Sequence, residues 1–236
     1  MPRPRRDSEI LPAKERLENA FWTLLADRPF SKITVTDVVH EARVNRNSFY
    51  YHFSGLPELA DSAIMVEIER LPLPPVPDSH DDPLVVWHTF CSSMVASPEN
   101  IQRIDHLALL TSDHSTRDLV ESLRDFMRLT LLSLLDETPS SINNTKRVLL
   151  DFAVGGILSL LSHWPSMRHT VTLREVQNRD VAVLAMGLYV SMSRQDIDGF
   201  WERLYLDSAH LGGKDSAIAG LEAYRVWPAP GCTHPL

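Results

Sequence analysis

The segment that most constrains the fold is a pair of short helical patterns, at about 35–42 and 46–52, separated by only a few residues. Asn45 precedes the second pattern, in the place where a helix N-cap is expected. Phe49 and Phe53 are four residues apart, so a helix presents them on one face, where they can anchor it to a core. Two short helices joined by a tight turn are typical of a helix-turn-helix.

A longer helix is predicted before this pair. Pro12 suits its first turn, where a missing N–H costs nothing, and Pro29 stops it. Thr34 then serves as the N-cap of the first short helix, with Asp37 three residues later as a variant of the capping box. The long helix has one apolar face, with the i, i+3, i+4 spacing of Leu17, Ala20, Phe21, Leu24 and Leu25.

The remainder also has helical spacing, and no stretch alternates with period two, so no sheet is predicted. We expect an all-α fold: an N-terminal three-helix helix-turn-helix domain plus a C-terminal antiparallel helical bundle. The predicted divisions are a flexible basic arm (1–11), the helix-turn-helix domain (12–56), a larger domain (57–227) and a frayed tail (228–236). The helices expected in the larger domain span about 57–71, 83–96, 98–111, 115–137, 143–164 and 173–192, with one or two more between Glu202 and Ala223.

Charge is unevenly distributed along the chain. The net charge is −8, yet residues 1–56 hold nine Lys or Arg against seven Asp or Glu. A mildly basic N-terminal end on an acidic remainder suits a chain that touches phosphates at one end only. Two distant cysteines support neither a disulfide framework nor a zinc site. No secretory signal and no membrane-spanning segment are expected, because the best apolar stretch, Leu149 to Trp164, contains Asp151 and His163. These features favour a cytoplasmic protein.

The second short helix carries the chemistry that duplex recognition needs. Arg46 and Asn47 lie in its first turn, where side chains can enter the major groove; Arg pairs bidentately with guanine and Asn with adenine. Polar and aromatic residues follow that can hold phosphates. They are Ser48, Tyr50, Tyr51 and His52.

From Ile33 to Phe53 the sequence resembles the DNA-binding region of the TetR family. The resemblance rests on a Thr at the cap, an apolar-patterned helix, a polar turn and the run Phe49-Tyr50-Tyr51-His52-Phe53, and it covers about residues 12–60. It implies a TetR-like fold in which Thr34 and Thr36 meet phosphates, Arg46, Asn47 and Ser48 lie in the groove, and Tyr50, Tyr51 and His52 lie near the DNA backbone.

The sequence departs from the family pattern at two places. Arg43 stands where the family's turn usually has glycine, and a non-glycine residue in a left-handed turn is strained, so a different turn is expected. Ser54-Gly55-Leu56 replaces a segment that is often rich in lysine, which removes a phosphate contact. The arginines of the arm, at positions 3, 5 and 6, offer compensation by entering the minor groove.

For the larger domain, the resemblance implies a homodimer and a pocket for a small-molecule effector. The last two long helices then pair with their copies in a second chain, through Leu149, Phe152, Gly156, Leu160, Val183, Met186 and Tyr189. The central helices enclose the pocket, with Trp87, Phe90, Met94, His106, Phe126 and Met127 as its expected lining. For each of these residues the alternative is a place in the chain's own core.

The resulting prediction is a ligand-responsive regulator, most often a repressor in this family, that binds a palindromic operator in double-stranded DNA as a homodimer. The alternatives are a helical protein-interaction module and a helical enzyme. No catalytic motif or cofactor fingerprint is present. No metal site is expected, because no pair among His80, His88, His106 and His114 has the i, i+4 helical spacing.

Overall fold

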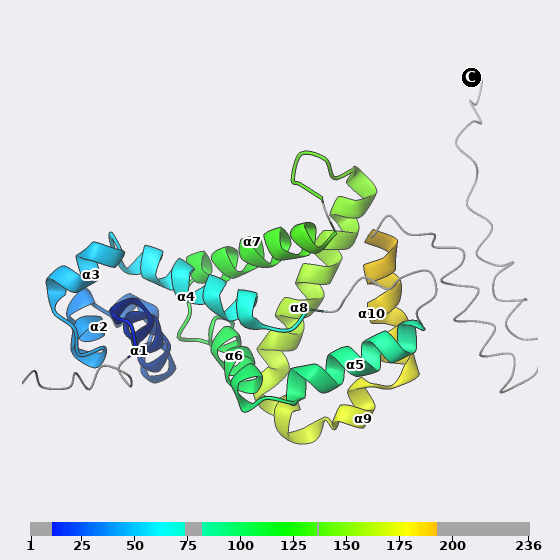
Figure 1. The fold of residues 1–236 in the computed structure, drawn as a ribbon, viewed down its shortest axis with the longest axis horizontal. Coiled ribbons are helices and arrows are strands. Elements are labelled where there is room, and N and C mark those ends of the chain that lie inside the picture. Colours follow the sequence, from blue (N-terminus) through cyan, green and yellow to red (C-terminus); the bar gives the residue numbers. More distant parts are fainter. Residues whose placement is uncertain (1–10, 74–81, 136, 193–236) are drawn as a thin grey trace, which may run out of the picture.

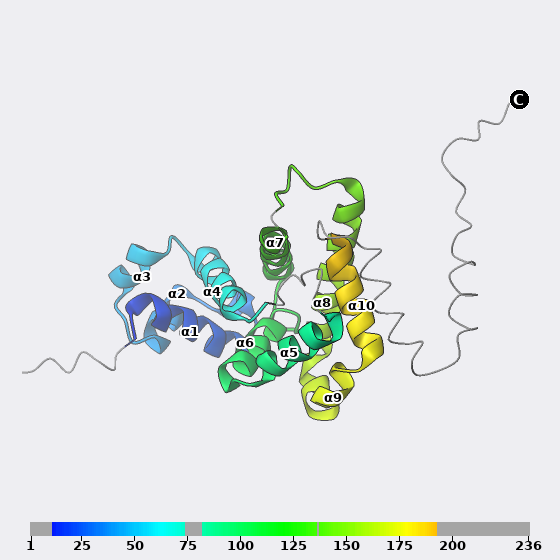
Figure 2. The same cartoon turned by 45° about the vertical axis from the view of Figure 1, so that its right-hand side comes forward.

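The computed structural model describes residues 11–73, 82–135 and 137–192. Within these ranges the chain is helical and contains no strand, as predicted. Three helices and a short 3-10 turn form a head at one end of the molecule, and a larger body forms the rest (Figures 1 and 2). The basic arm up to residue 10, the helices expected between Glu202 and Ala223, and the tail from 228 lie outside the described residues.

The head has the helices that the sequence predicts, with bounds that differ by a residue or so. The apolar face of the first helix is buried throughout, and Phe49 and Phe53 close the same core from the third helix. Burial of these side chains is what holds helices of seven residues in place. The elements of the head are α1 (Ala13–Asp27), η1 (Phe30–Lys32), α2 (Val35–Glu41) and α3 (Arg46–His52).

Helix α4 (Leu56–Arg70) runs from the head into the body, where it packs on α6 and α7 (Figure 1). Glu18 of α1 is buried against it, and the Ser62 hydroxyl donates to Glu18 Oε1 at 2.7 Å. Lys14 Nζ lies 3.5 Å from the same carboxylate. Because a buried carboxylate is costly without such partners, the contact between Ser62 and Glu18 helps to fix α4 on α1.

Helix α8 is the central element of the body and packs on α6, α7 and α10. Helices α8 and α10 lie side by side at the end of the body remote from the head (Figures 1 and 2). The body contains α5 (Pro83–Val95), α6 (Pro98–Leu109), α7 (Arg117–Leu134), α8 (Asn144–Thr170), α9 (Leu173–Val176) and α10 (Arg179–Met192).

Helix α8 continues through Pro165, where the sequence predicted a break. Asp105 of α6 explains the continuation. Trp164 Nε1 donates to Asp105 Oδ1 at 2.7 Å, and the Arg168 guanidinium binds the same carboxylate from the other side of the proline. A helix held on both sides of a proline tolerates the missing hydrogen bond, so the predicted end at 164 is wrong.

The helix expected over 173–192 is divided between α9 and α10. The break occurs at Gln177 and Asn178, where α5 supplies hydrogen-bond partners. Gln177 Nε2 donates to the carbonyl of His88 at 3.0 Å, and Trp87 Nε1 donates to the carbonyl of Val176 at 2.9 Å. These side-chain contacts satisfy polar groups at the end of α9, and α10 then starts in a new direction.

Candidate nucleic-acid interface

Helix α2 begins at a complete capping box, as predicted. Thr34 Oγ1 accepts from the Asp37 backbone N–H at 3.2 Å, and Asp37 Oδ2 accepts from the Thr34 backbone N–H at 2.8 Å. The hydrogen bonds from Thr34 hold the pKa of the Asp37 carboxyl below its ordinary value. Thr34 and Thr36 remain exposed at this helix start. The Thr34 hydroxyl itself donates to Asp37 Oδ2 at 2.6 Å, so a phosphate placed at this helix start would compete with Asp37 for that donor.

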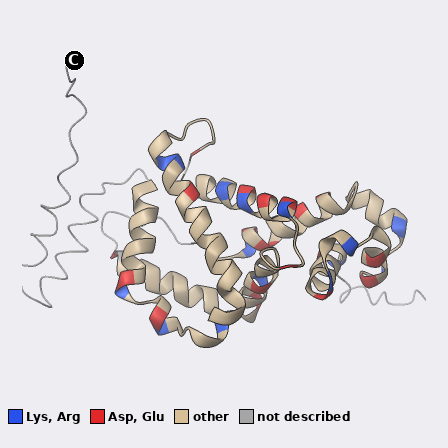
Figure 3. Cartoon of the chain, turned by 180° about the vertical axis from the view of Figure 1, so that it is seen from behind, with Lys and Arg blue, Asp and Glu red and all other residues tan. Residues whose placement is uncertain are grey.

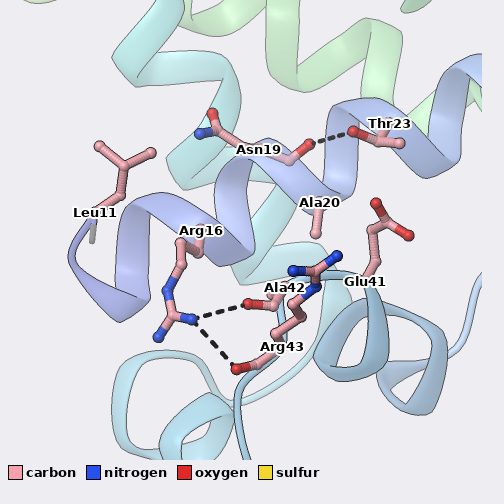
Figure 4. Close-up of a pocket in the computed structure, with 8 residues that line it drawn as sticks. All are labelled: Leu11, Arg16, Asn19, Ala20, Thr23, Glu41, Ala42 and Arg43. Atoms are coloured by element: carbon pink, nitrogen blue, oxygen red, sulfur yellow. Dashed lines mark hydrogen bonds between the residues drawn. The ribbon is translucent and has the colours of Figure 1, made fainter. Parts of the chain in front are cut away.

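The turn between α2 and α3 is left-handed although it lacks glycine. Arg43 has a φ of 53°, so the expectation of a different turn is wrong. Arg16 of α1 supplies the reason, because its Nη1 donates to the carbonyls of Ala42 and Arg43, each at 3.2 Å (Figure 4). This clamp from another helix stabilises a conformation that the local sequence disfavours. Sequence analysis missed the role of Arg16, since nothing in its spacing marks it.

An open hollow of about 500 Å³ lies beside this turn, between α1 and the end of α2 (Figure 4). Its walls are polar on the Arg16 side and apolar at Ala20 and Ala42. It is lined by Leu11, Arg16, Asn19, Ala20, Thr23, Glu41, Ala42 and Arg43.

Replacing Arg43 by glycine is expected to stabilise the protein. Glycine adopts a positive φ without steric cost, so Arg43→Gly should raise the free energy of unfolding by about 1 kcal/mol. Urea unfolding followed by circular dichroism measures the change. Glu41→Gly is the matched control: Glu41 is helical, so glycine there should lower stability by about 0.5–1 kcal/mol. A loss of stability in both variants would show that Arg43 is not strained.

Helix α3 has two chemically different sides. Its cap is Asn45, whose side chain accepts from the Ser48 backbone N–H at 2.7 Å. Phe49 is fully buried, whereas Tyr51 is 84% exposed. The Arg46 guanidinium lies 5.7 Å from the centre of the Tyr50 ring, and Arg46 Nη2 is 3.4 Å from the Tyr50 hydroxyl. This contact restrains a long cationic side chain on the outward side of the helix.

The structure places the eight predicted DNA-contacting residues at the start of α2 and on α3. Six are exposed: Thr34, Thr36, Arg46, Asn47, Tyr50 and Tyr51. Ser48 and His52 are half-buried and lie at the edge of the same surface. The exposed side chains at the start of α2 and on α3 can donate hydrogen bonds to phosphates and to base edges.

The six residues expected to line an effector pocket are distributed over α5, α6 and α7. Trp87 packs on Phe90, with ring centres 5.6 Å apart, and is held to α9 by its indole N–H. His106 instead faces the head, where its ring stacks on Trp22. Met94 and Phe126 are half-buried and Met127 is buried. None of the six lines the hollow beside α1.

A second open hollow, of about 530 Å³, lies between α7 and α8 and is also free of those six residues. Its floor is apolar, and Arg128 crosses its rim to Asp151, with a separation of 2.7 Å from Nη2 to Oδ1. It is lined by Asp125, Arg128, Leu129, Leu132, Pro139, Ile142, Arg147, Leu150 and Asp151.

The expected dimer residues fall into two groups. On α8, Phe152 is 64% exposed and Leu160 is 57% exposed, and Gly156 is exposed between them, while Leu149 is half-buried. On α10, Met186 and Tyr189 are buried in this chain's own core, and Val183 is half-buried. The outward apolar residues of α10 are instead Val181 and Leu184, which are 39% and 66% exposed.

Among the described residues, no group of three or more His, Cys, Asp or Glu side chains is placed to hold a metal ion. Cys91 is buried, and burial raises the pKa of its thiol to about 11. A thiol with so high a pKa is a poor nucleophile and metal ligand.

The family model of the bacterial regulatory proteins of the tetR family matches residues 19–63, which span most of α1, all of α2 and α3, and the first half of α4. No curated protein matches the chain. Among solved structures, NalD of Pseudomonas aeruginosa, the secondary repressor of the MexAB-OprM multidrug efflux pump, is 16% identical, with a TM-score of 0.48, and covers 78% of this chain and 98% of its own. The TetR family repressor AlkX of Dietzia sp. strain DQ12-45-1b, implicated in biodegradation of n-alkanes, is 16% identical, with a TM-score of 0.40, over 78% of this chain and 99% of its own.

Proposed function

We propose that the chain, whose residues 19–63 match the tetR-family model, is a cytoplasmic transcriptional repressor of that family without enzymatic activity. It binds a palindromic operator as a homodimer and is released by a small-molecule effector. The observation that carries this proposal is the division of α3 into two sides. Phe49 is buried on one side and anchors the helix, and polar residues face outward on the other.

The outward side of α3 suits the major groove of a duplex. Arg46 and Asn47 stand in the first turn, and their side chains have the donor and acceptor patterns that distinguish guanine and adenine. Thr34 and Thr36 start the neighbouring helix and reach the DNA backbone, which fixes the register of α3 along the groove. Tyr50 and Tyr51 add further hydrogen-bonding groups on the same exposed surface.

The surface of α8 supports a dimer. The helix is long and apolar enough, by length and composition only, to cross a bilayer, and only 17% of its apolar window is buried in this chain. Figure 3 shows the middle of α8 without charged residues. We propose that a second copy of the chain, and not a membrane, covers this exposed apolar face. We define the dimer face as the exposed apolar residues of α8 and α10, namely Val148, Phe152, Leu160, Val181 and Leu184.

Two glycines on the same side of α8 allow a close approach. Apart from the neighbouring residues and backbone of α8 itself, no atom lies within 4 Å of the position that a Cβ would occupy on Gly155 or Gly156. A facing helix can therefore come near the α8 backbone at this point. The dimer places two α3 helices for simultaneous binding, and half-sites about one helical turn, roughly 34–36 Å, apart are the spacing that such dimers read.

Release by an effector follows from a shift between dimer geometries. A ligand that binds more tightly to the geometry in which the two heads do not fit adjacent grooves lowers operator affinity. The half-buried apolar side chains of α5 and α7 offer the contacts for an apolar effector. From the sequence prediction these are half-buried Trp87, Phe90, Met94 and Phe126 together with buried Met127, whereas the sixth predicted residue, His106, faces the head.

Selection from a pool of random duplexes tests the proposed function. The purified full chain should enrich a sequence with an inverted repeat, and its affinity for that duplex should fall steeply as salt rises, because phosphate contacts release counterions. A chain that enriches no duplex over the starting pool would favour the interaction-module alternative. A single half-site without an inverted copy would contradict the dimer.

A further inference from the structure

A histidine of the body contacts the head at the junction between the two parts. We call this junction, where α6 and the loop after it meet α1 and α4, the seam. The His106 ring of α6 stacks on the Trp22 ring of α1, with centres 5.0 Å apart and planes 5° from parallel. His106 Nδ1 lies 2.7 Å from Glu67 Oε1 of α4. Because an ionised carboxylate can only accept, Nδ1 carries the proton of this hydrogen bond. One side chain therefore links α6 to both α1 and α4.

The same carboxylate is held from a second direction. Arg103 Nε of α6 lies 3.6 Å from Glu67 Oε2, so Glu67 has one oxygen toward each of two α6 side chains. All three groups are largely buried, with between 12% and 21% of each side chain exposed. Low exposure strengthens such contacts relative to a surface ion pair. Helices α1, α4 and α6 thus meet at a restrained point.

A second histidine makes a separate link. His114 follows α6 in the loop before α7, and its Nδ1 donates to the carbonyl of Leu25, near the end of α1, at 2.8 Å. The carbonyl of His114 accepts from the backbone N–H of Phe30 at 2.8 Å. His114 therefore forms hydrogen bonds with Leu25, before the bend between α1 and η1, and with Phe30, after it. The two histidines contact α1 at Trp22 and at Leu25, about one helical turn apart.

We propose that His106 and His114 are positioning residues that fix the angle of the head on the body, and so set the spacing of the two half-sites that the dimer reads. The inference rests on the proposed function. In the proposed dimer the bodies are joined through α8 and α10, so the distance between the two α3 helices depends on the angle at each seam. Neither histidine belongs to the surface formed by α2 and α3, so their effect on DNA binding acts through geometry.

A distance measurement tests the seam without DNA. Spin labels at Asn19→Cys on α1 and Leu129→Cys on α7 report the angle between head and body within one chain, with unlabelled chains in excess. Cys232→Ser removes one native thiol, and buried Cys91 resists labelling. The parent should give one narrow distribution, and His106→Ala or His114→Ala should widen it at least about twofold, since each removes a restraint on a two-body joint.

The matched control for the distance measurement is His88→Ala. The His88 ring also lies 2.8 Å from a backbone carbonyl, that of Gln177, but it joins α5 to α9, away from the head. The spin-label distance distribution of His88→Ala should equal that of the parent. If either seam variant loses its helical circular dichroism, His114→Leu and Glu67→Leu, which lack the hydrogen-bonding atoms of these contacts and have an uncharged side chain of similar size, take its place. An unchanged distribution in all the folded seam variants overturns the proposal.

Operator duplexes with altered half-site spacing give the second readout. The parent should favour one spacing by about tenfold over duplexes two base pairs longer or shorter, and the seam variants by less than about threefold, because a loosened head accommodates several registers. Affinity for an isolated half-site should not change, whereas simple unfolding would lower it. If the parent binds no duplex, the proposed function fails while the distance measurement still decides the role of the seam.

Discussion

Phe152→Glu should convert the protein from a dimer into a monomer and lower its affinity for a palindromic duplex by about 100-fold or more. Phe152 is 64% exposed in the single chain, so the substitution leaves the core of this chain intact. In the dimer the glutamate would lie in an apolar interface beside its copy, and an unpaired buried charge costs about 3–5 kcal/mol. Sedimentation equilibrium measures the association, and fluorescence anisotropy with a labelled duplex measures DNA binding.

Leu129→Glu is the control for this prediction. Leu129 is a similarly exposed apolar residue, but it belongs to α7 and lies outside the dimer face. The variant should remain a dimer and keep its affinity for DNA. A Phe152→Glu protein that sediments as a dimer would place the interface elsewhere, and one that becomes monomeric without losing operator affinity would show that a single head suffices for binding.

Arg46→Ala should weaken binding to the selected duplex by about 1–3 kcal/mol and relax the choice of base at one position of each half-site. Arg46 is exposed in the first turn of α3 and is restrained by Tyr50, so its guanidinium is placed to reach a base edge. Loss of a phosphate contact would weaken binding to all sequences alike. Repeating the selection with the variant separates the two cases, because only a lost base contact changes the preferred sequence.

Arg117→Ala provides the comparison for Arg46→Ala. Arg117 is an exposed arginine at the start of α7, outside α2 and α3, and its loss should change neither affinity nor base preference. Wild-type affinity and base preference in Arg46→Ala would show that Arg46 does not read a base.

The head was predictable from the sequence because its determinants are local. Caps at Thr34 and Asn45, prolines at the ends of α1, and the four-residue spacing of Phe49 and Phe53 each act within one turn of helix. These signals also determine which residues of α3 face outward. The outward residues of α3 therefore follow from helical periodicity once the anchoring side is known, whereas Thr34 and Thr36 joined the predicted set through the resemblance to the TetR family.

Features that depend on distant contacts were not predictable. The left-handed Arg43 is held by Arg16, which is 27 positions away in the sequence, and the continuation of α8 through Pro165 depends on Asp105 of α6. Local patterns contain no signal for either partner. Sequence reasoning can flag Arg43 as strained, but only the fold shows which side chain compensates.

The outward side of α10 was mispredicted for a different physical reason. The helix carries apolar residues on most of its circumference, so its periodicity does not distinguish the side that packs inside the chain from the side left open. Met186 and Tyr189 pack inward, and Leu184 faces out. The register of the proposed dimer face became visible only with α5 and α8 in place. The same limit applies to the effector residues, which are distributed over three helices.

Site-specific photocrosslinking tests most directly whether the outward side of α3 contacts the duplex. A benzophenone amino acid in place of Tyr51, which is 84% exposed, should crosslink to the selected duplex within a half-site on irradiation. The same group in place of Leu129 should give no crosslink. Crosslinks from position 129 and none from position 51, at protein concentrations where the duplex is bound, would contradict the assignment of α3 as the DNA-reading helix.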